Sequence, residues 1–470
     1  MIRSLSDITA PYFIGIAGTG MSALAQYLQG IGIQVAGSDR QFVKGKESDV
    51  QTKLIQAGIR CFEQDGTSLT PAFDVVIVST AIEDTVIEMQ QVKQLGIPIL
   101  HRAALLALIA ASKKTIAVAG TSGKSTTSAM LFQILEKAGY QPGIISGAGL
   151  VHIIEEGKIG NAVAGKGEWL VIEADESDGS IVQYHPHTGV LLNIDKDHDE
   201  TETLISLFTT FKNNCENFLV NRTHALATTL SVDAGKDFKV RKSVEAENGQ
   251  QANTEELVGY CAESFSQEGM TISFLVNGQS VRLQQIGQHN MENALAAMAV
   301  AHQVGVPLAI AATALGDYKG IYRRHQVWGQ KRGVWLIDDY AHNPVKCAAA
   351  IRACQPVASK VIAWFQPHGF KPTRFLRNDF VQEFVSVLRS GDEIWMSEIY
   401  YAGGAAVKDI SAADLINDMK QLGVAAFFVA DRSELVARLR AHLSEDCVLL
   451  LMGARDPSLE TFAREVWEAL

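Results

Sequence analysis

The stretch Lys114-Thr-Ile-Ala-Val-Ala-Gly-Thr-Ser-Gly-Lys-Ser-Thr-Thr127 decides how the rest of the chain is interpreted. Its apolar first half predicts a buried strand, and a helical pattern begins near Thr126. Small residues between a strand and a helix let backbone N–H groups surround phosphate oxygens; here Lys124 can reach the outer phosphates and the Ser125 hydroxyl can ligate Mg²⁺. The sequence therefore predicts a nucleoside triphosphate site. Val118 stands where the full motif has its first glycine, so a turn that merely contains Gly-Lys-Ser is the alternative.

Acidic side chains follow the next two predicted strands. Carboxylates at the tip of a buried strand lose solvation unless a positive group meets them, and a Mg²⁺ ion that carries ATP would do so. A solvated acidic loop is the structural alternative. The residues are Glu173, Asp175, Glu176 and Asp178 after the first of these strands, and Asn193, Asp195, Asp197 and His198 after the second.

A third cluster follows residue 322. Arg323 and Arg324 stand beside a predicted domain junction, where an arginine can stabilise charge on a transferred phosphoryl group. A carboxylate after the next strand suits a ribose hydroxyl, and an aromatic ring there could stack. The residues concerned are Asp338, Asp339, Tyr340, His342 and Asn343, with His368 and Arg374 in another loop after a strand.

Length and strand rhythm predict an α/β fold of three domains. The chain has 470 residues, and domains average about 150 residues. The expected domains are a Rossmann-like N-terminal domain over 1–110, a central P-loop ATPase domain over 111–322 with a polar antiparallel portion at 221–282, and an α/β domain over 323–470. Strands are expected at 12–17, 33–36, 74–79, 97–100, 114–119, 169–173, 189–193, 334–337, 361–365, 393–396, 426–430 and 448–452, with a hairpin at 270–283.

Composition excludes several classes of protein. Hydrophobic residues make up 47% of the chain and charged residues 20%, which excludes a disordered protein. The net charge of −11 disfavours nucleic-acid binding. The six cysteines form no Cys-x-x-Cys pair, the N-terminus has no signal-peptide core, and no apolar run approaches the roughly 20 residues of a membrane span. A cytoplasmic protein without membrane insertion is expected, as a monomer or homodimer.

Together these stretches resemble the Mur ligase family, the ATP-dependent amide ligases of peptidoglycan precursor synthesis. The phosphate loop, both acidic strand ends and the Asp338-Asp-Tyr-Ala-His342 stretch are similar to family motifs and occur in the family's order, as does Gly287-Gln-His-Asn-Met-Glu-Asn293, which resembles an adenine-side motif. Gly15-Ile-Ala-Gly-Thr-Gly-Met-Ser, Gly37-Ser-Asp and Val78-Ser-Thr-Ala resemble the branch that adds an amino acid to UDP-N-acetylmuramate, with L-alanine as the expected acceptor.

The resemblance implies roles for individual residues. Lys124 would hold the β- and γ-phosphates, Ser125 and Glu173 would ligate Mg²⁺, and His198 would serve a second metal or orient an acyl phosphate. Arg324 would meet the γ-phosphate, Asp339 the ribose, and Tyr340, His342 and Arg374 the free amino acid. The remaining ATP-site residues would be Gly120, Thr121, Ser122, Gly123, Thr126, Asn290 and Asn293. The UDP-sugar would lie against Gly15, Gly18, Thr19, Gly20, Met21, Ser22, Ser38, Asp39, Ser79, Thr80 and Ala81.

Other functions remain open at this point. The glycine turn at 15–20 with Asp39 is also compatible with a dinucleotide-dependent oxidoreductase. Departures from the family pattern at Ser122, Asn343 and Arg455-Asp456 leave room for a nucleotide-binding homologue that does not ligate. Within the ligases, the alternatives are a recycling enzyme that attaches a preformed peptide to UDP-N-acetylmuramate, and a ligase that acts on another carboxylate.

Overall fold

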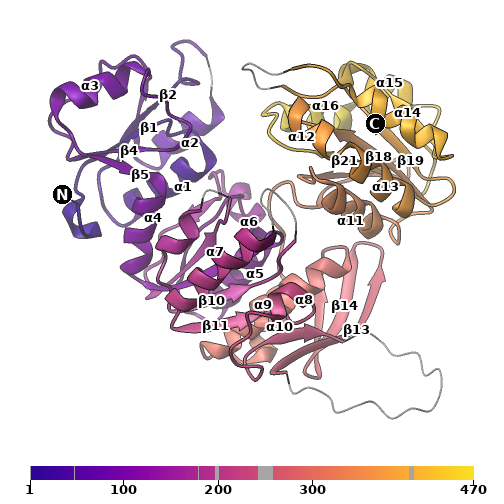
Figure 1. Cartoon of the computed structure of the whole chain (residues 1–470), viewed down its shortest axis with the longest axis horizontal. Coiled ribbons are helices and arrows are strands. Elements are labelled where there is room, and N and C mark those ends of the chain that lie inside the picture. The colour runs from indigo at the N-terminus through magenta and orange to yellow at the C-terminus, as the bar shows by residue number, and fades with distance from the viewer. Residues whose placement is uncertain (1, 47, 178, 196–200, 242–257, 402–406) are drawn as a thin grey trace. The chain divides into compact units, whose positions relative to one another are not determined.

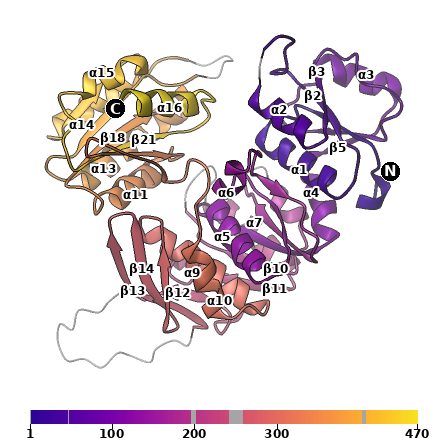
Figure 2. The same ribbon diagram turned by 180° about the vertical axis from the view of Figure 1, so that it is seen from behind.

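The computed structural model describes residues 2–46, 48–177, 179–195, 201–241, 258–401 and 407–470. The chain divides into two compact units (Figures 1 and 2). Unit 1 comprises Met1–Ser264, Phe274–Arg282 and Glu292–Ile321, and unit 2 comprises Phe265–Ser273, Leu283–Met291 and Tyr322–Leu470. The domain boundaries expected from the sequence stay predictions. No helix in the described ranges is long and apolar enough to cross a bilayer.

The first sheet of unit 1 has five parallel strands in the order β3-β2-β1-β4-β5. Because β1 lies between β2 and β4, its carboxyl end is the point where the strand order reverses, which is where open parallel sheets bind ligands. The elements are β1 (Pro11–Ile14), β2 (Ala36–Asp39), β3 (Arg60–Glu63), β4 (Val75–Val78), β5 (Ile99–His101), η1 (Leu5–Asp7), α1 (Thr19–Gly30), α2 (Asp49–Gln56), α3 (Ile87–Leu95) and α4 (Arg102–Ala111).

The second strand lies three residues later than the expected 33–36. Residues 31–35 instead close helix α1: the Ile33 N–H donates to the carbonyl of Leu28, Gly32 has φ +94°, and the Val35 N–H donates to Gln29 Oε1. Apolar residues in a helix end therefore gave a pattern that resembles a strand.

The second sheet of unit 1 has six strands in the order β11-β10-β6-β9-β7-β8, and all pairs but β7–β8 are parallel. Strand β6 therefore lies between the two strands that the acidic residues follow. The elements are β6 (Lys114–Ala119), β7 (Gly143–Ile145), β8 (Ala162–Val163), β9 (Trp169–Ala174), β10 (Thr188–Leu191), β11 (Asn217–Val220), α5 (Lys124–Lys137), α6 (Val151–Glu155), η2 (Ser180–Gln183), α7 (Thr201–Asn214), α8 (Ala225–Thr228) and α10 (Leu308–Gly316). Helix α9 (Gln288–Gln303) begins in unit 2 and continues in unit 1 from Glu292.

A four-stranded sheet, β12-β13-β14-β15, follows in the polar portion of the chain. The expected hairpin is β14 (Thr271–Val276) and β15 (Gln279–Leu283), joined by Asn277 and Gly278, both with positive φ as a tight hairpin turn requires. The expectation of an antiparallel portion is wrong for its first pair, because β12 (Phe238–Val240) runs parallel to β13 (Tyr260–Glu268).

The sheet of unit 2 has the strand order β16-β17-β21-β18-β19-β20, and only β16–β17 is antiparallel. Alternate side chains of β18 face two cores: Ala363 and Phe365 pack with α11, α13 and α14, and Ile362 and Trp364 pack with α15 and α16. Figure 2 shows the ribbons of β18 and of these helices. The elements are β16 (Gln326–Lys331), β17 (Val334–Asp339), β18 (Lys360–Gln366), β19 (Glu393–Met396), β20 (Ala426–Phe428), β21 (Cys447–Gly453), α11 (Pro344–Cys354), α12 (Phe370–Phe375), α13 (Arg377–Val387), α14 (Ala412–Gln421), η3 (Arg432–Glu434), α15 (Leu435–Leu439) and α16 (Leu459–Ala469).

Candidate active site

The phosphate loop joins β6 to α5 through two glycines in backbone conformations that other residues rarely adopt. Gly120 has φ +137° and Gly123 has φ +86°. A Cβ atom at Gly123 would lie 2.4 Å from Oδ1 of Asn293, and one at Gly120 would lie 3.0 Å from Cβ of Leu192. Helix α5 begins at Lys124, two residues before the expected start. The loop therefore needs glycine at both positions to reach the helix in this shape.

Asn193, two residues after the end of strand β10, holds the loop in place. Its Oδ1 accepts hydrogen bonds from the Ser122 N–H (2.8 Å) and from the Thr121 hydroxyl (2.9 Å), and its Nδ2 donates to the Ser122 carbonyl (3.1 Å). The Asp195 N–H donates to the same threonine hydroxyl at 3.0 Å. The end of strand β10 and the phosphate loop after β6 therefore lie side by side in unit 1.

Lys124 is buried among acceptors. Its Nζ lies 2.7 Å from Oε2 of Glu176, 3.8 Å from Oδ1 of Asp175 and 2.7 Å from the carbonyl oxygen of Gly120. Burial would lower the pKa of Lys124, but the carboxylates of Glu176 and Asp175 outweigh it and raise that pKa above its ordinary value. The ammonium group therefore stays charged, as an interaction with phosphate requires.

Glu173, on β9, lies beside the hydroxyl of Ser125. The Ser125 Oγ donates to Oε2 at 2.9 Å, while Oε1 accepts from the Ser146 hydroxyl (2.7 Å) and from the Gly147 N–H (2.6 Å). One hydroxyl and one carboxylate are a fitting donor set for Mg²⁺, which usually takes one or two protein carboxylates and fills its shell with water and substrate phosphates. In the described residues, no three His, Cys, Asp or Glu side chains are grouped to hold a metal without such phosphates. His198, Asp178 and Asp197 lie outside the described residues.

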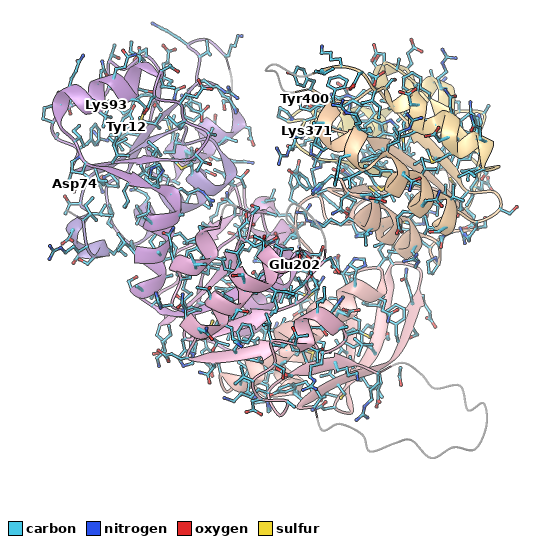
Figure 3. All side chains as sticks on the ribbon, viewed as in Figure 1. Tyr12, Asp74, Lys93, Glu202, Lys371 and Tyr400 are labelled. Carbon is cyan, nitrogen blue, oxygen red and sulfur yellow. The ribbon has the colours of Figure 1, made fainter. Side chains whose placement is uncertain are left out.

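The expected UDP-sugar residues gather at the carboxyl ends of β1, β2 and β4. Gly15 has φ +79°, and Asp39 Oδ2 accepts from the Ala17 N–H at 2.9 Å, which fixes the turn before α1. Ser38 is fully buried next to Tyr12, which Figure 3 labels, so its side chain faces the core. Of the other predicted residues, Gly18, Thr19, Thr80 and Ala81 are exposed, Gly15, Gly20 and Ser79 are half-buried, and Met21 and Ser22 are buried.

In unit 2, the two adjacent aspartates after β17 have separate partners. Asp338 pairs with Arg323 through Nε (2.9 Å) and Nη2 (3.2 Å), and burial raises the pKa of Asp338 to about 6 although the guanidinium opposes the rise. Asp339 accepts from the N–H of His325 (2.7 Å) and from the Ala341 N–H (2.7 Å), and its Oδ2 lies 3.1 Å from Nδ1 of the His325 ring. The chain's own donors thus hold both carboxylates.

The remaining predicted residues of unit 2 form a looser group. The Arg324 guanidinium lies 4.5 Å from the ring centre of Tyr340, and the rings of His342 and His368 are 5.6 Å apart. Arg374, on α12, forms an ion pair with Asp409. Asn290 donates to the Ile286 carbonyl at 2.8 Å.

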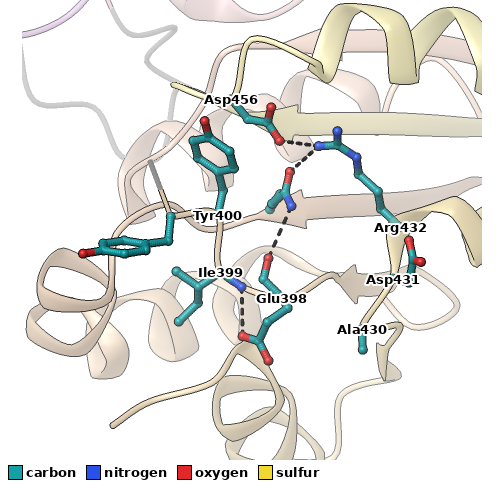
Figure 4. A pocket seen from close by; sticks show the side chains of 9 residues that line it. Glu398, Ile399, Tyr400, Ala430, Asp431, Arg432 and Asp456 are labelled. Carbon is teal, nitrogen blue, oxygen red and sulfur yellow. Dashed lines mark hydrogen bonds and ion pairs between the residues drawn. The ribbon is translucent and has the colours of Figure 1, made fainter. Parts of the chain in front are cut away.

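A pocket of about 510 Å³ opens at the carboxyl edge of the same sheet (Figure 4). Arg432 lines it and donates to Asp456 Oδ2 (2.5 Å) and Gln366 Oε1 (2.8 Å). Tyr400, labelled in Figures 3 and 4, follows β19 and also lines the pocket. Neither Arg432 nor Tyr400 belongs to a sequence motif, so the sequence did not predict this pocket.

Comparison with known proteins decides the family. Three family models match: "Mur ligase family, catalytic domain" over 11–114, "Mur ligase middle domain" over 118–301, and "Mur ligase, glutamate ligase domain" over 323–455. The UDP-N-acetylmuramate–L-alanine ligase of Carboxydothermus hydrogenoformans is 33% identical over 96% of this chain and 95% of its own. The chain belongs to the Mur ligase family.

Two solved Mur ligase structures are similar in fold. The UDP-N-acetylmuramate-alanine ligase of Thermotoga maritima has a TM-score of 0.78 at 26% identity, and the comparison covers 98% of both chains. The murein peptide ligase of Psychrobacter arcticus has a TM-score of 0.65 at 20% identity, again over 98% of both chains. The predicted family and the predicted fold of three α/β domains are confirmed.

Membership of the Mur ligase family tests the role of no single residue, including those of the N-terminal glycine turn. The role of each predicted site residue therefore stays a prediction. In the phosphate loop, the predicted residues lie together with two that the sequence did not single out, Ser146 and Gly147, which hold Glu173. The sequence gives little indication of their role, because Ser146 and Gly147 are ordinary loop residues after the three-residue strand β7.

Proposed function

We propose that the protein joins L-alanine to the carboxylate of UDP-N-acetylmuramate, with ATP converted to ADP and phosphate. The observation that carries the proposal is the phosphate loop of unit 1, where Lys124 is charged and the Ser125 hydroxyl lies 2.9 Å from Glu173 Oε2. The names of relatives such as the 33%-identical ligase of Carboxydothermus hydrogenoformans support the choice of substrates. Such a reaction draws on cytoplasmic nucleotides, so we expect the protein in the cytoplasm.

The first step is transfer of the γ-phosphoryl group of ATP to a carboxylate oxygen of the sugar substrate, which gives an acyl phosphate and ADP. Lys124 neutralises charge on the phosphate chain during this transfer, and the N–H groups of the first turn of α5 donate hydrogen bonds to the remaining phosphate oxygens. Arg324 is the proposed second cation for the γ-phosphate. In the second step, the amine of alanine attacks the acyl carbon, phosphate leaves with the C–O bond electrons, and the amine loses a proton.

Ser125 and Glu173 would hold Mg²⁺. When bound, the ion would neutralise charge on the transferred phosphoryl group. Because Ser146 and the Gly147 N–H occupy Oε1 of Glu173, its Oε2 is the oxygen that would face the ion.

We further propose that the turn at Gly15–Gly20 receives the diphosphate of the UDP-sugar. This turn lies at the N-terminus of the 12-residue helix α1, whose first N–H groups attract anions. For the acceptor, we propose Tyr340, His342 and Arg374. Breaking of the Arg374–Asp409 ion pair would release the guanidinium for a carboxylate.

The test is phosphate release from Mg–ATP and UDP-N-acetylmuramate with a panel of acceptors: L-alanine, glycine, L-serine and the wall tripeptide. Turnover that requires L-alanine supports the proposal. Turnover with the tripeptide alone would make the protein a recycling ligase, and ATP binding without turnover for any acceptor would favour the homologue that does not ligate. Saturable NADH binding would revive the oxidoreductase alternative.

A further inference from the structure

The buried residue Asn161 joins two parts of unit 1 that lie far apart in the sequence. It precedes the edge strand β8 and is 1% exposed. Its Nδ2 donates to the carbonyl of Thr19 (2.9 Å) and to the hydroxyl of Ser22 (3.1 Å), and its Oδ1 accepts from Gln26 Nε2 (2.7 Å). Both groups of its amide are therefore bonded to the first two turns of α1.

The main chain of Asn161 continues the connection in the opposite direction. Its carbonyl accepts the N–H of Ser146 at 2.9 Å, and the hydroxyl of that serine donates to Oε1 of Glu173 at 2.7 Å. The other oxygen of Glu173 accepts from Ser125 in the phosphate loop at 2.9 Å. An unbroken series of hydrogen bonds thus runs from the start of α1 to the phosphate loop.

Three residues of this series, Asn161, Ser146 and Ser22, are shielded from water. Ser146 is 3% exposed and Ser22 is 1% exposed, so a lost partner would leave a buried polar group unsatisfied. Backbone packing beside the series is also close, since a Cβ atom on Gly30 would lie 2.5 Å from Cβ of Ala164, directly after β8. A shift of α1 therefore has to move Asn161 or break its bonds.

We propose that Asn161 is a positioning residue that couples binding of the sugar nucleotide at the α1 turn to binding of Mg–ATP at the phosphate loop. The inference rests on the proposed function. A ligand that orders the first turn of α1 fixes the carbonyl of Thr19 and the hydroxyl of Ser22. Asn161 transmits that order to Ser146, and Ser146 holds Glu173 in the orientation in which its other oxygen, Oε2, lies beside Ser125 and can meet Mg²⁺. Asn161 itself touches no reacting atom.

Coupling of this kind is reciprocal, which makes it measurable in both directions. Calorimetry on the full chain gives the Kd of Mg–AMP-PNP with and without saturating UDP-N-acetylmuramate, and the Kd of the sugar nucleotide with and without Mg–AMP-PNP. For the wild type, we expect each ligand to raise the affinity for the other by the same factor, at least about five-fold. For Asn161→Ala, we expect both factors to fall to about one.

A matched control separates coupling from general loss of an amide. Asn214→Ala also removes an Nδ2 that donates to a main-chain carbonyl, that of Val182 at 2.9 Å, but it lies off the series and should keep the wild-type factor. Gln26→Ala removes one of the three side-chain bonds of Asn161 and serves if Asn161→Ala does not fold, which thermal denaturation checks. Gln26→Ala should lower the coupling factor to a value between that of the wild type and one.

Two results would overturn the proposal: a wild-type factor of one, or a factor that Asn161→Ala and Gln26→Ala leave unchanged. Phosphate release by the wild type, measured on the same preparation, distinguishes this failure from failure of the proposed function. Turnover with an unchanged factor removes the coupling role alone. Absence of both turnover and sugar-nucleotide binding removes the function and the coupling together.

Discussion

Replacement of Lys124 by alanine is expected to leave a buried carboxylate without its counter-ion. The side chain of Glu176 is 6% exposed, and its Oε2 lies 2.7 Å from Lys124 Nζ. Removal of one partner of a buried ion pair typically costs about 3 kcal/mol or more. For a domain of about 150–250 residues, 1 kcal/mol shifts the melting temperature by about 2–4 °C. We therefore expect Lys124→Ala to melt about 6–12 °C below the wild type, apart from its effect on catalysis.

The loss of stability in Lys124→Ala should become smaller as the pH falls. Burial raises the pKa of Glu176, so the folded state binds a proton more tightly than the unfolded state does. Stability then falls as pH rises above the ordinary pKa of a glutamate and is regained as pH falls and the carboxyl group becomes neutral. Without Lys124 the effect grows, so Lys124→Ala should approach the wild-type melting temperature as the pH falls toward the ordinary pKa of a glutamate.

The double variant Lys124→Ala/Glu176→Gln separates stability from catalysis. Glutamine removes the buried charge, so most of the lost stability should return at pH 8, while turnover stays at least about 100-fold below the wild type because the phosphate chain lacks its cation. Differential scanning fluorimetry and phosphate release measure the two properties on one preparation. A single variant as stable as the wild type at pH 8, or a double variant that regains turnover, would refute the reasoning.

Three further predictions follow from the geometry. Gly123→Ala should weaken binding of Mg–AMP-PNP at least about ten-fold, since its Cβ would lie 2.4 Å from Asn293 Oδ1; a wild-type Kd by calorimetry would contradict this. Glu173→Gln should raise the Mg²⁺ concentration for half-maximal turnover about ten-fold or more, and an unchanged magnesium dependence would remove Glu173 from the metal site. Burial raises the pKa of Asp338, which is paired with Arg323, to about 6. The unfolding free energy of the wild type minus that of Asp338→Asn, measured by urea titration, should therefore fall between about pH 4 and pH 7. A difference that rises with pH would contradict this prediction.

The phosphate loop could be predicted from the sequence because its chemistry is local. Gly120 and Gly123 are needed where the backbone turns into α5, and Lys124 and Ser125 follow at fixed spacing. Glu173 directly precedes the last residue of an apolar strand, so its place at the sheet edge followed from strand length alone.

Partners across the fold could not be predicted in this way. Gln26 and Asn161 are 135 positions apart, and nothing in either segment indicates that β8 lies against α1. Ser38 follows the pattern of a ligand-facing strand end, yet β2 begins three residues later than expected and the side chain is fully buried. Likewise, the sequence suggested that an arginine at 323 or 324 could stabilise a transferred phosphoryl group, whereas the guanidinium of Arg323 is bonded to Asp338.

The most direct test of the central claim is an isotope measurement. UDP-N-acetylmuramate with both carboxylate oxygens labelled with ¹⁸O is incubated with the protein, Mg–ATP and L-alanine, and the released phosphate is analysed by mass spectrometry. Activation through an acyl phosphate predicts one ¹⁸O atom in each phosphate and a product that carries one added alanine residue and retains the other ¹⁸O atom. Unlabelled phosphate would mean that ATP is hydrolysed by water, and the ligase account would then be wrong.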